Sequence, residues 1–109
     1  VTGLDLVALQ IRVAQGLPLG LVQQDVTLNG HAIEVRLYAE DPAQGFLPAT
    51  GPAGLWRPAT GDGIRVDAGI ETGQAVTPFY DPMVAKVVAW GETRETARRP
   101  GLRARILPR

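Results

Sequence analysis

An arginine between polar neighbours is the feature of this sequence with the clearest chemical potential. Arg36 lies in "GHAIEVRLYAED", residues 30–41, where apolar and polar residues alternate as in a strand with one buried face. The same open face would carry Glu34, Tyr38 and Glu40. A guanidinium stays charged, and its planar fork of N–H donors matches a carboxylate or bicarbonate. The stretch therefore predicts either an anion site or a solvated face of exposed charge pairs.

A second candidate is the aspartate in "PFYDPMVAK", residues 78–86. Asp81 precedes a proline, which restricts it to extended backbone, and Lys86 follows on a predicted strand. One interpretation is an Asx-type turn beside an exposed lysine. The other is an aspartate fixed next to a positive group at a binding site or subunit contact. The residues alone leave both interpretations open.

The composition excludes several classes of protein and of site. Eleven basic and eleven acidic side chains cancel, so no excess charge favours nucleic acid or an anionic membrane as a partner. The absence of cysteine and the single histidine exclude a disulfide framework and a multi-histidine metal site, and we predict no metal site. No apolar run is long enough to cross a bilayer, which needs about 18 residues. The chain of 109 residues fits one small domain or a part of a larger one.

One helix and several short strands would have to position the candidate side chains. The helix is predicted to begin with Thr2 as N-cap and Asp5 in its first turn, and to end at Gly16 as the C′ residue. Apolar residues cover most of its circumference, so we expect an upstream segment to pack against it. The predicted strands are residues 32–39, 55–57, 64–68, 74–77 and 83–90. Close Gly/Pro turns between them favour a small, mainly antiparallel sheet and an α+β fold.

Three other stretches are predicted to carry little regular structure. Residues 16–30 are expected to be a linker and residues 43–54 a loop, because Gly and Pro interrupt both. Thr93 is a candidate N-cap for a second helix, which Pro100 would end after about two turns. Residues 99–109 form an atypical, Arg-rich tail. A disordered terminus, a frameshift or truncation, and a basic partner-binding segment are the alternatives for it.

Three stretches together resemble the C-terminal part of biotin carboxylase, the ATP-dependent component of acyl-CoA carboxylases and pyruvate carboxylase. They are "VTGLDLVALQIRVAQGLPL", "LNGHAIEVRLYAEDPAQGFLPATG" and "IRVDAGIETGQAVTPFYDPMVAKVVAWGETRETA". The combination of "GHAIEVRLYAEDP…FLP" with the later "YDPMVAK" is the most specific part. The resemblance implies that residues 1–20 end an ATP-grasp domain and that residues 21–98 form a biotin carboxylase C-terminal domain. Residues 99–109 depart from the family pattern.

The resemblance also implies a reaction in two steps. ATP with Mg²⁺ activates bicarbonate to carboxyphosphate, and the carboxylate then moves to N1′ of biotin on a carrier protein. Arg36 matches the family arginine that contacts bicarbonate and the biotin ureido oxygen, where it would act catalytically by stabilising the biotin enolate. Glu34 and Glu40 would orient this arginine. Asp81 matches the family aspartate near the biotin site and the dimer face.

The family segments that bind ATP and metal precede the part that this sequence resembles. We therefore expect a fragment of a biotin-dependent carboxylase, a ligase, that is inactive alone. Its expected partners are the ATP-grasp portion, the biotin carboxyl carrier, the carboxyltransferase component and a second copy of the enzyme. The expected location is the cytoplasm, or the mitochondrial matrix of a eukaryote. The alternatives are a non-catalytic dimerisation or carrier-binding module of the same descent and an unrelated small β domain.

Overall fold

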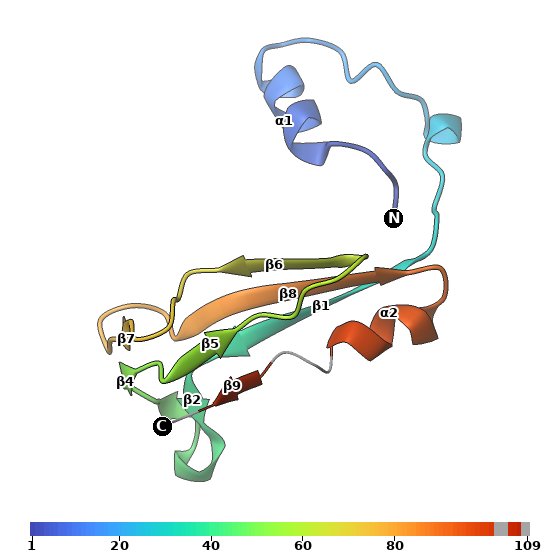
Figure 1. Cartoon of the computed structure of the whole chain (residues 1–109). Helices are drawn as coiled ribbons and strands as arrows, with labels where there is room; N and C mark the ends of the chain where they lie inside the picture. Colours follow the sequence, from blue (N-terminus) through green and yellow to red (C-terminus); the bar gives the residue numbers. More distant parts are fainter. Residues whose placement is uncertain (102–104, 108–109) are drawn as a thin grey trace.

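A three-stranded antiparallel sheet forms the centre of the computed structural model, which describes residues 1–101 and 105–107. Its strand order is β1 (His31–Tyr38), β8 (Met83–Gly91) and β6 (Ile64–Ala68), so β8 lies in the middle. Helix α2 (Arg94–Gly101) contacts both β1 and β8 and runs along the sheet in Figure 1. The predicted α+β fold is confirmed.

Short antiparallel strands pair in twos around this sheet, as far as the structure describes the chain. The pairs are β2 (Glu40–Asp41) with β3 (Leu47–Pro48), β4 (Gly51–Pro52) with β7 (Ala75–Val76), and β5 (Leu55–Arg57) with β9 (Arg105–Leu107). The chain also forms two single 3-10 turns, η1 (Gln23–Asp25) and η2 (Pro42–Gln44).

The strands β1, β5, β6, β7 and β8 were predicted, but β2, β3, β4 and β9 were not. Predicting residues 43–54 as loop was wrong where β3 and β4 form, and predicting residues 16–30 as linker missed η1. Both β3 and β4 contain a proline, which in a sequence pattern favours a loop over a strand. Residues 105–107 of the predicted tail form β9. Residues 102–104 and 108–109 of that tail lie outside the described residues.

Helix α1 (Leu6–Ala14) begins later than predicted because Asp5, not Thr2, is its N-cap. The Asp5 carboxylate accepts a hydrogen bond from a backbone N–H three residues on, at 2.9 Å. The Thr2 hydroxyl instead accepts one from the N–H of Leu4 at 3.4 Å, in a local turn before the helix. Gly16 takes a left-handed φ of 76° after the helix, as its predicted C′ role requires.

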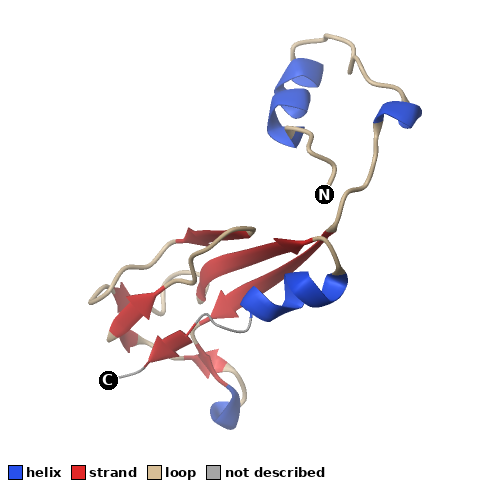
Figure 2. Ribbon diagram, turned by 45° about the vertical axis from the view of Figure 1, so that its right-hand side comes forward, coloured by secondary structure: helices blue, strands red, loops and turns tan. Residues whose placement is uncertain are grey.

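The N-terminal segment with α1 stands off one end of the sheet in both views (Figures 1 and 2). None of the residues of α1 is buried, and Leu6 and Val7 are 61% and 64% exposed. The radius of gyration of 17.8 Å exceeds the roughly 13 Å of a compact domain of this length. The rest of the described chain therefore leaves the apolar circumference of α1 uncovered. No helix in the described part is both long and apolar enough to cross a bilayer.

The core lies on one face of the sheet, where β8 is covered on that side. Val87 and Ala89 of β8 are 2% and 1% exposed, and Ala97 of α2, which contacts this strand and β1, is fully buried. A bulge opposite the end of β1 shifts the register, so Val84 and Ala85 are both buried although they are adjacent in sequence. Val84 thereby joins a second small cluster with Ala53 and Ile70 under the short strands.

Strand β1 shows the predicted alternation with one exception. Ile33 and Leu37 are half-buried, whereas Glu34 and Arg36 are exposed. Val35 shares the apolar face but remains 41% exposed, because β1 is an edge of the sheet and is only partly covered. On the apolar face of β1, Ile33 and Leu37 are therefore more buried than Val35 between them.

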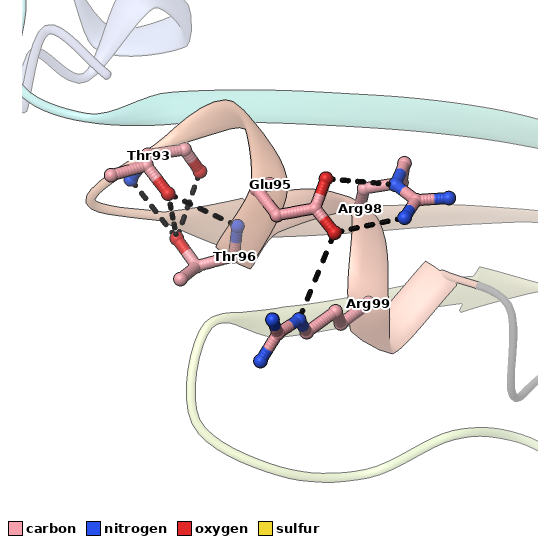
Figure 3. A network of polar contacts seen from close by, with 5 residues as sticks. All are labelled: Thr93, Glu95, Thr96, Arg98 and Arg99. Atoms are coloured by element: carbon pink, nitrogen blue, oxygen red, sulfur yellow. Dashed lines mark hydrogen bonds and ion pairs between the residues drawn. The ribbon is translucent and has the colours of Figure 1, made fainter.

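A reciprocal pair of threonines begins α2, as Figure 3 shows. The Thr93 hydroxyl accepts the N–H of Thr96 at 3.2 Å, and the Thr96 hydroxyl accepts the N–H of Thr93 at 2.9 Å. In the first turn, Glu95 forms an ion pair with Arg98 at 2.8 Å and a longer one with Arg99 at 3.8 Å. The predicted helix and its Thr93 cap are confirmed, and the two-threonine arrangement resembles a capping box.

Gly30, at the entry to β1, is expected to tolerate substitution poorly. Its φ is 68°, and a Cβ atom would lie 2.6 Å from the carbonyl O of Gly91 and 2.7 Å from the ring of Trp90. Gly45 has a similar φ of 70°, but a Cβ there would meet nothing within 4 Å. We predict that Gly30→Ala lowers the free energy of unfolding by about 3 kcal/mol, from backbone strain plus overpacking. Gly45→Ala should cost about 1 kcal/mol from strain alone.

Urea denaturation of the two variants, followed by Trp fluorescence, measures this difference. Equal losses for Gly30→Ala and Gly45→Ala would show that the close approach of Trp90 to Gly30 does not restrict this position.

Candidate functional site

One face of the central sheet gathers charged side chains from all three strands. Because side chains alternate along a strand, the register determines which residues share a face. Arg36 of β1 is paired with Lys86 of β8, and Lys86 is paired with Asp67 of β6. The adjacent row on the same face consists of Glu34, Val88 and Arg65. We call these six residues the charged face.

Arg36 is held within its own strand by Glu34. The Nε–H group of Arg36 donates to Oε1 of Glu34 at 3.3 Å, and the two side chains are 63% and 44% exposed. The hydrogen bond to Glu34, and then the side chain of Tyr38, raise the pKa of Arg36 above its usual range. Arg36 is therefore permanently charged, and its described hydrogen bond to Glu34 uses Nε and not a terminal nitrogen.

On the opposite edge of the charged face, Asp67 lies between two cations. Its Oδ1 accepts a hydrogen bond from Nε of Arg65 at 2.9 Å, and its Oδ2 lies 3.4 Å from Nζ of Lys86. The hydrogen bond from Arg65, and to a smaller extent the contact with Lys86, lower the pKa of Asp67. Asp67 is thus a carboxylate at neutral pH, and it fixes Lys86 from the side away from Arg36.

Asp81 lies at the end of the sheet where β1 finishes. Its Oδ1 accepts a hydrogen bond from the N–H of Met83 at 2.7 Å, which is the Asx-type turn of the first interpretation. Met83 is the strand partner of Tyr38, so Asp81 lies beyond the end of the paired region. The described ion pair of Lys86 runs to Asp67 and not to Asp81. Asp81 itself is exposed beside the strongly exposed Phe79 and Tyr80.

Glu40 lies apart from the Glu34–Arg36 pair. It belongs to β2 and lines a cavity of about 310 Å³ together with Tyr38 and the buried Ala53. Among the described residues, the ion pair of Arg36 runs to Glu34 alone. The structure thus brings Glu34 to Arg36 and places Glu40 next to the cavity, with Tyr38 between the two regions.

Comparisons with known proteins identify relatives of this chain. The family model described as "Biotin carboxylase C-terminal domain" matches residues 34–104. The chain belongs to this family. It is 51% identical over 98 residues to the mitochondrial methylcrotonoyl-CoA carboxylase subunit alpha of Oryza sativa subsp. japonica and 45% identical over 97 residues to biotin carboxylase 1 of Bacillus subtilis. These matches cover 89% of this chain but only 13% and 22% of the two relatives.

Solved structures of the family superpose closely on this biotin carboxylase C-terminal domain. The biotin carboxylase domain dimer of the 2-oxoglutarate carboxylase of Hydrogenobacter thermophilus, in complex with MgADP, ADP and bicarbonate, matches with a TM-score of 0.86 and 38% identity. The match covers 98% of this chain and 24% of that one. The resemblance stated from the sequence motifs is therefore confirmed, and the chain corresponds to a minor part of its relatives' length.

Sequence reasoning missed most of the charged face of this biotin carboxylase C-terminal domain. Arg36 and Glu34 were found because they lie two residues apart on one strand. Lys86 was noted only as an exposed strand lysine, and Arg65 and Asp67 were not singled out. These three lie on strands far from β1 in sequence, so only the register of β8 with both neighbours brings them together. Their period-2 positions were the available signal, but no local pattern specifies which strands pair.

The lowered pKa of Asp67 predicts an acid-sensitive contribution to folding. A carboxyl with a lower pKa in the folded chain stabilises the fold above its unfolded pKa of about 3.9 and loses this contribution as the pH falls through its folded pKa. We predict that the pKa of the Asp67 carboxyl group in the folded chain lies below the unfolded value of about 3.9. In Arg65→Gln the midpoint should rise, because the largest stabilising contact of the carboxylate is removed.

Carbon-13 NMR of the Asp67 carboxyl as a function of pH measures both midpoints. Arg57→Gln, which removes an exposed strand arginine outside the charged face, is the matched control and should leave the titration of Asp67 unchanged. An Asp67 midpoint that does not move in Arg65→Gln would contradict the ion pair.

Proposed function

We propose that this domain supplies the arginine that binds bicarbonate and biotin in the ATP-dependent carboxylation of carrier-bound biotin. The proposal rests on the position of Arg36, on its contacts and on its exposure to solvent. Its guanidinium is held on a strand of the central sheet by Glu34, which accepts a hydrogen bond from Nε, with Tyr38 on its other side, and its side chain is 63% exposed. A side chain that contacts a ligand is held more rigidly when it projects from a strand than when it projects from a loop.

The chemistry of Arg36 fits the ligand that the family implies. A guanidinium with its Nε occupied can direct its terminal N–H groups at two oxygens of bicarbonate, or at a ureido oxygen, by charge-assisted hydrogen bonds. Bound biotin supplies the ureido nitrogen that accepts the carboxyl group and the ureido oxygen on which negative charge grows. Arg36 would stabilise that charge with a cation already fixed in place, which is the most effective form of electrostatic catalysis.

Supporting roles for Glu34, Glu40 and Asp81 belong to the same proposal. Glu34 orients Arg36, in keeping with their contact at 3.3 Å. Glu40 would act from the cavity side, through Tyr38 or after a change of side-chain conformation, because its position beside the cavity separates it from Arg36. Asp81, fixed by its Asx turn at the end of the sheet, would line the approach of biotin or face a second copy of the enzyme.

The remainder of the activity is assigned to parts of the enzyme beyond these residues. Among the described residues, no three His, Asp or Glu side chains gather as ligands for a metal ion. We therefore assign ATP and Mg²⁺ to an ATP-grasp portion. Residues 1–20 would be the end of that portion, and residues 21–98 the C-terminal domain proper. The uncovered apolar surface of α1 supports this division, because such a helix needs a partner.

The further partners follow from the same reaction. A biotin carboxyl carrier would present biotin, and a carboxyltransferase component would use the product. The solved relative from Hydrogenobacter thermophilus is a dimer of biotin carboxylase domains, which supports a homodimer as the state of the intact enzyme. By itself this chain would be catalytically inert.

Replacement of Arg36 in a complete carboxylase that contains this domain tests the proposal. We expect Arg36→Ala to lower kcat for biotin carboxylation by about 10²–10³-fold, the usual effect of losing one group that stabilises developing charge. ATP binding should be unchanged, because Arg36 is not assigned to the nucleotide. Steady-state assays of biotin carboxylation and calorimetric titration with ATP measure the two effects.

Arg57→Gln is the matched control and should retain full activity, since Arg57 is an exposed strand arginine away from the charged face. Unchanged carboxylation in Arg36→Ala would sink the catalytic proposal. The domain would then be a non-catalytic dimerisation or carrier-binding module of the same descent.

A further inference from the structure

Two cations face each other across the central pair of strands, and among the described residues no carboxylate forms an ion pair with both. Arg36 and Lys86 are direct partners in the β1–β8 register, where opposite side chains are about 5 Å apart at Cβ. Each is paired with its own carboxylate: Arg36 with Glu34, two residues along the same strand, and Lys86 with Asp67 on the side away from Arg36. Like charges placed directly opposite each other destabilise a strand pair. Neither carboxylate pairs with both cations among the described residues, so Arg36 and Lys86 share no counter-charge.

We propose that Arg36 and Lys86 together bind one small oxyanion, so that Lys86 is a second binding residue of the bicarbonate site. An anion shared between the two side chains would remove their mutual repulsion and use donors that Glu34 and Asp67 leave free. Arg36 has its terminal nitrogens for this purpose. Lys86 carries three N–H donors, and its single described contact, with Oδ2 of Asp67 at 3.4 Å, leaves donors for another acceptor.

Asp67 is a positioning residue in this site. It contacts Lys86 and Arg65 and lies on the far side of Lys86 from Arg36. Removing the charge of Asp67 would free the ammonium group of Lys86 to move, but Lys86 would keep its N–H donors. The choice of bicarbonate as the anion rests on the proposed function. The inference that Arg36 and Lys86 bind a small oxyanion together does not.

The first test is direct binding to the 109-residue chain. Bicarbonate is titrated at constant ionic strength, with chloride as the reference salt, while NMR follows the Arg36 Nε–H and Lys86 Cε signals. We expect both signals to shift with one shared Kd. In Lys86→Gln, the Kd reported by Arg36 should rise about tenfold, since one charged hydrogen-bond donor is lost. Lys86→Arg should restore binding to within about threefold.

Two outcomes would overturn the inference. In one, bicarbonate shifts Arg36 but not Lys86, and Lys86→Gln leaves the Kd unchanged. In the other, chloride produces the same shifts as bicarbonate, which would reduce the effect to screening. Arg57→Gln is the control variant and should bind bicarbonate like the unaltered chain.

The second test uses a complete carboxylase and separates this inference from the proposed function. Lys86→Gln should raise the KM for bicarbonate about tenfold with a smaller change in kcat, whereas Asp67→Asn should raise it less. If Arg36→Ala abolishes carboxylation but Lys86→Gln leaves the KM for bicarbonate unchanged, the inference fails and the proposed function stands. If bicarbonate shifts both signals but Arg36→Ala leaves turnover unchanged, the anion site stands and the proposed function fails.

Discussion

The pairing of β8 with both of its neighbours is the constraint on which the rest of the structure depends. Its register against β1 and β6 is continuous through Ala85, Val87 and Ala89, all of which are nearly inaccessible to solvent. A slip of one residue would expose this apolar row and bury Lys86 in its place, which would leave a charge in the core. Burial of one face thus holds the charges of the other face in register.

The charged side chains of this face are not needed to hold the sheet together. Its ion pairs are exposed, and exposed pairs between flexible side chains contribute little to stability. Val87, Ala89 and the buried Ala97 of α2 hold the sheet together without them. The positions of Arg36 and Lys86 are therefore maintained by packing beneath them, and their charges remain available for a ligand.

Sequence alone predicts the parts of this arrangement that are local. The alternation around Arg36 and the Thr93 cap were both visible, because each lies within one element. Helix α1 shows the limit of such reasoning, since Thr2 was predicted as its N-cap and Asp5 as a first-turn residue, whereas Asp5 is the cap and Thr2 lies in a turn before the helix. The row of Arg36, Lys86 and Asp67 could not be predicted, because it requires the order of three strands that are distant in sequence. Motifs of the family identified the domain, but they did not reveal that row.

Exposure limits what this face can do by itself. Arg36 is 63% exposed, and a charge in contact with water stabilises developing negative charge far less than one in a site that excludes water. The sheet supplies position and charge, but a second surface has to cover Arg36 before its full electrostatic effect is realised. Helix α1 stands beyond one end of the sheet, with its apolar side uncovered (Figure 1). It leaves Arg36 and Arg65 largely exposed, so the full electrostatic effect of Arg36 depends on a covering surface that the described residues do not supply.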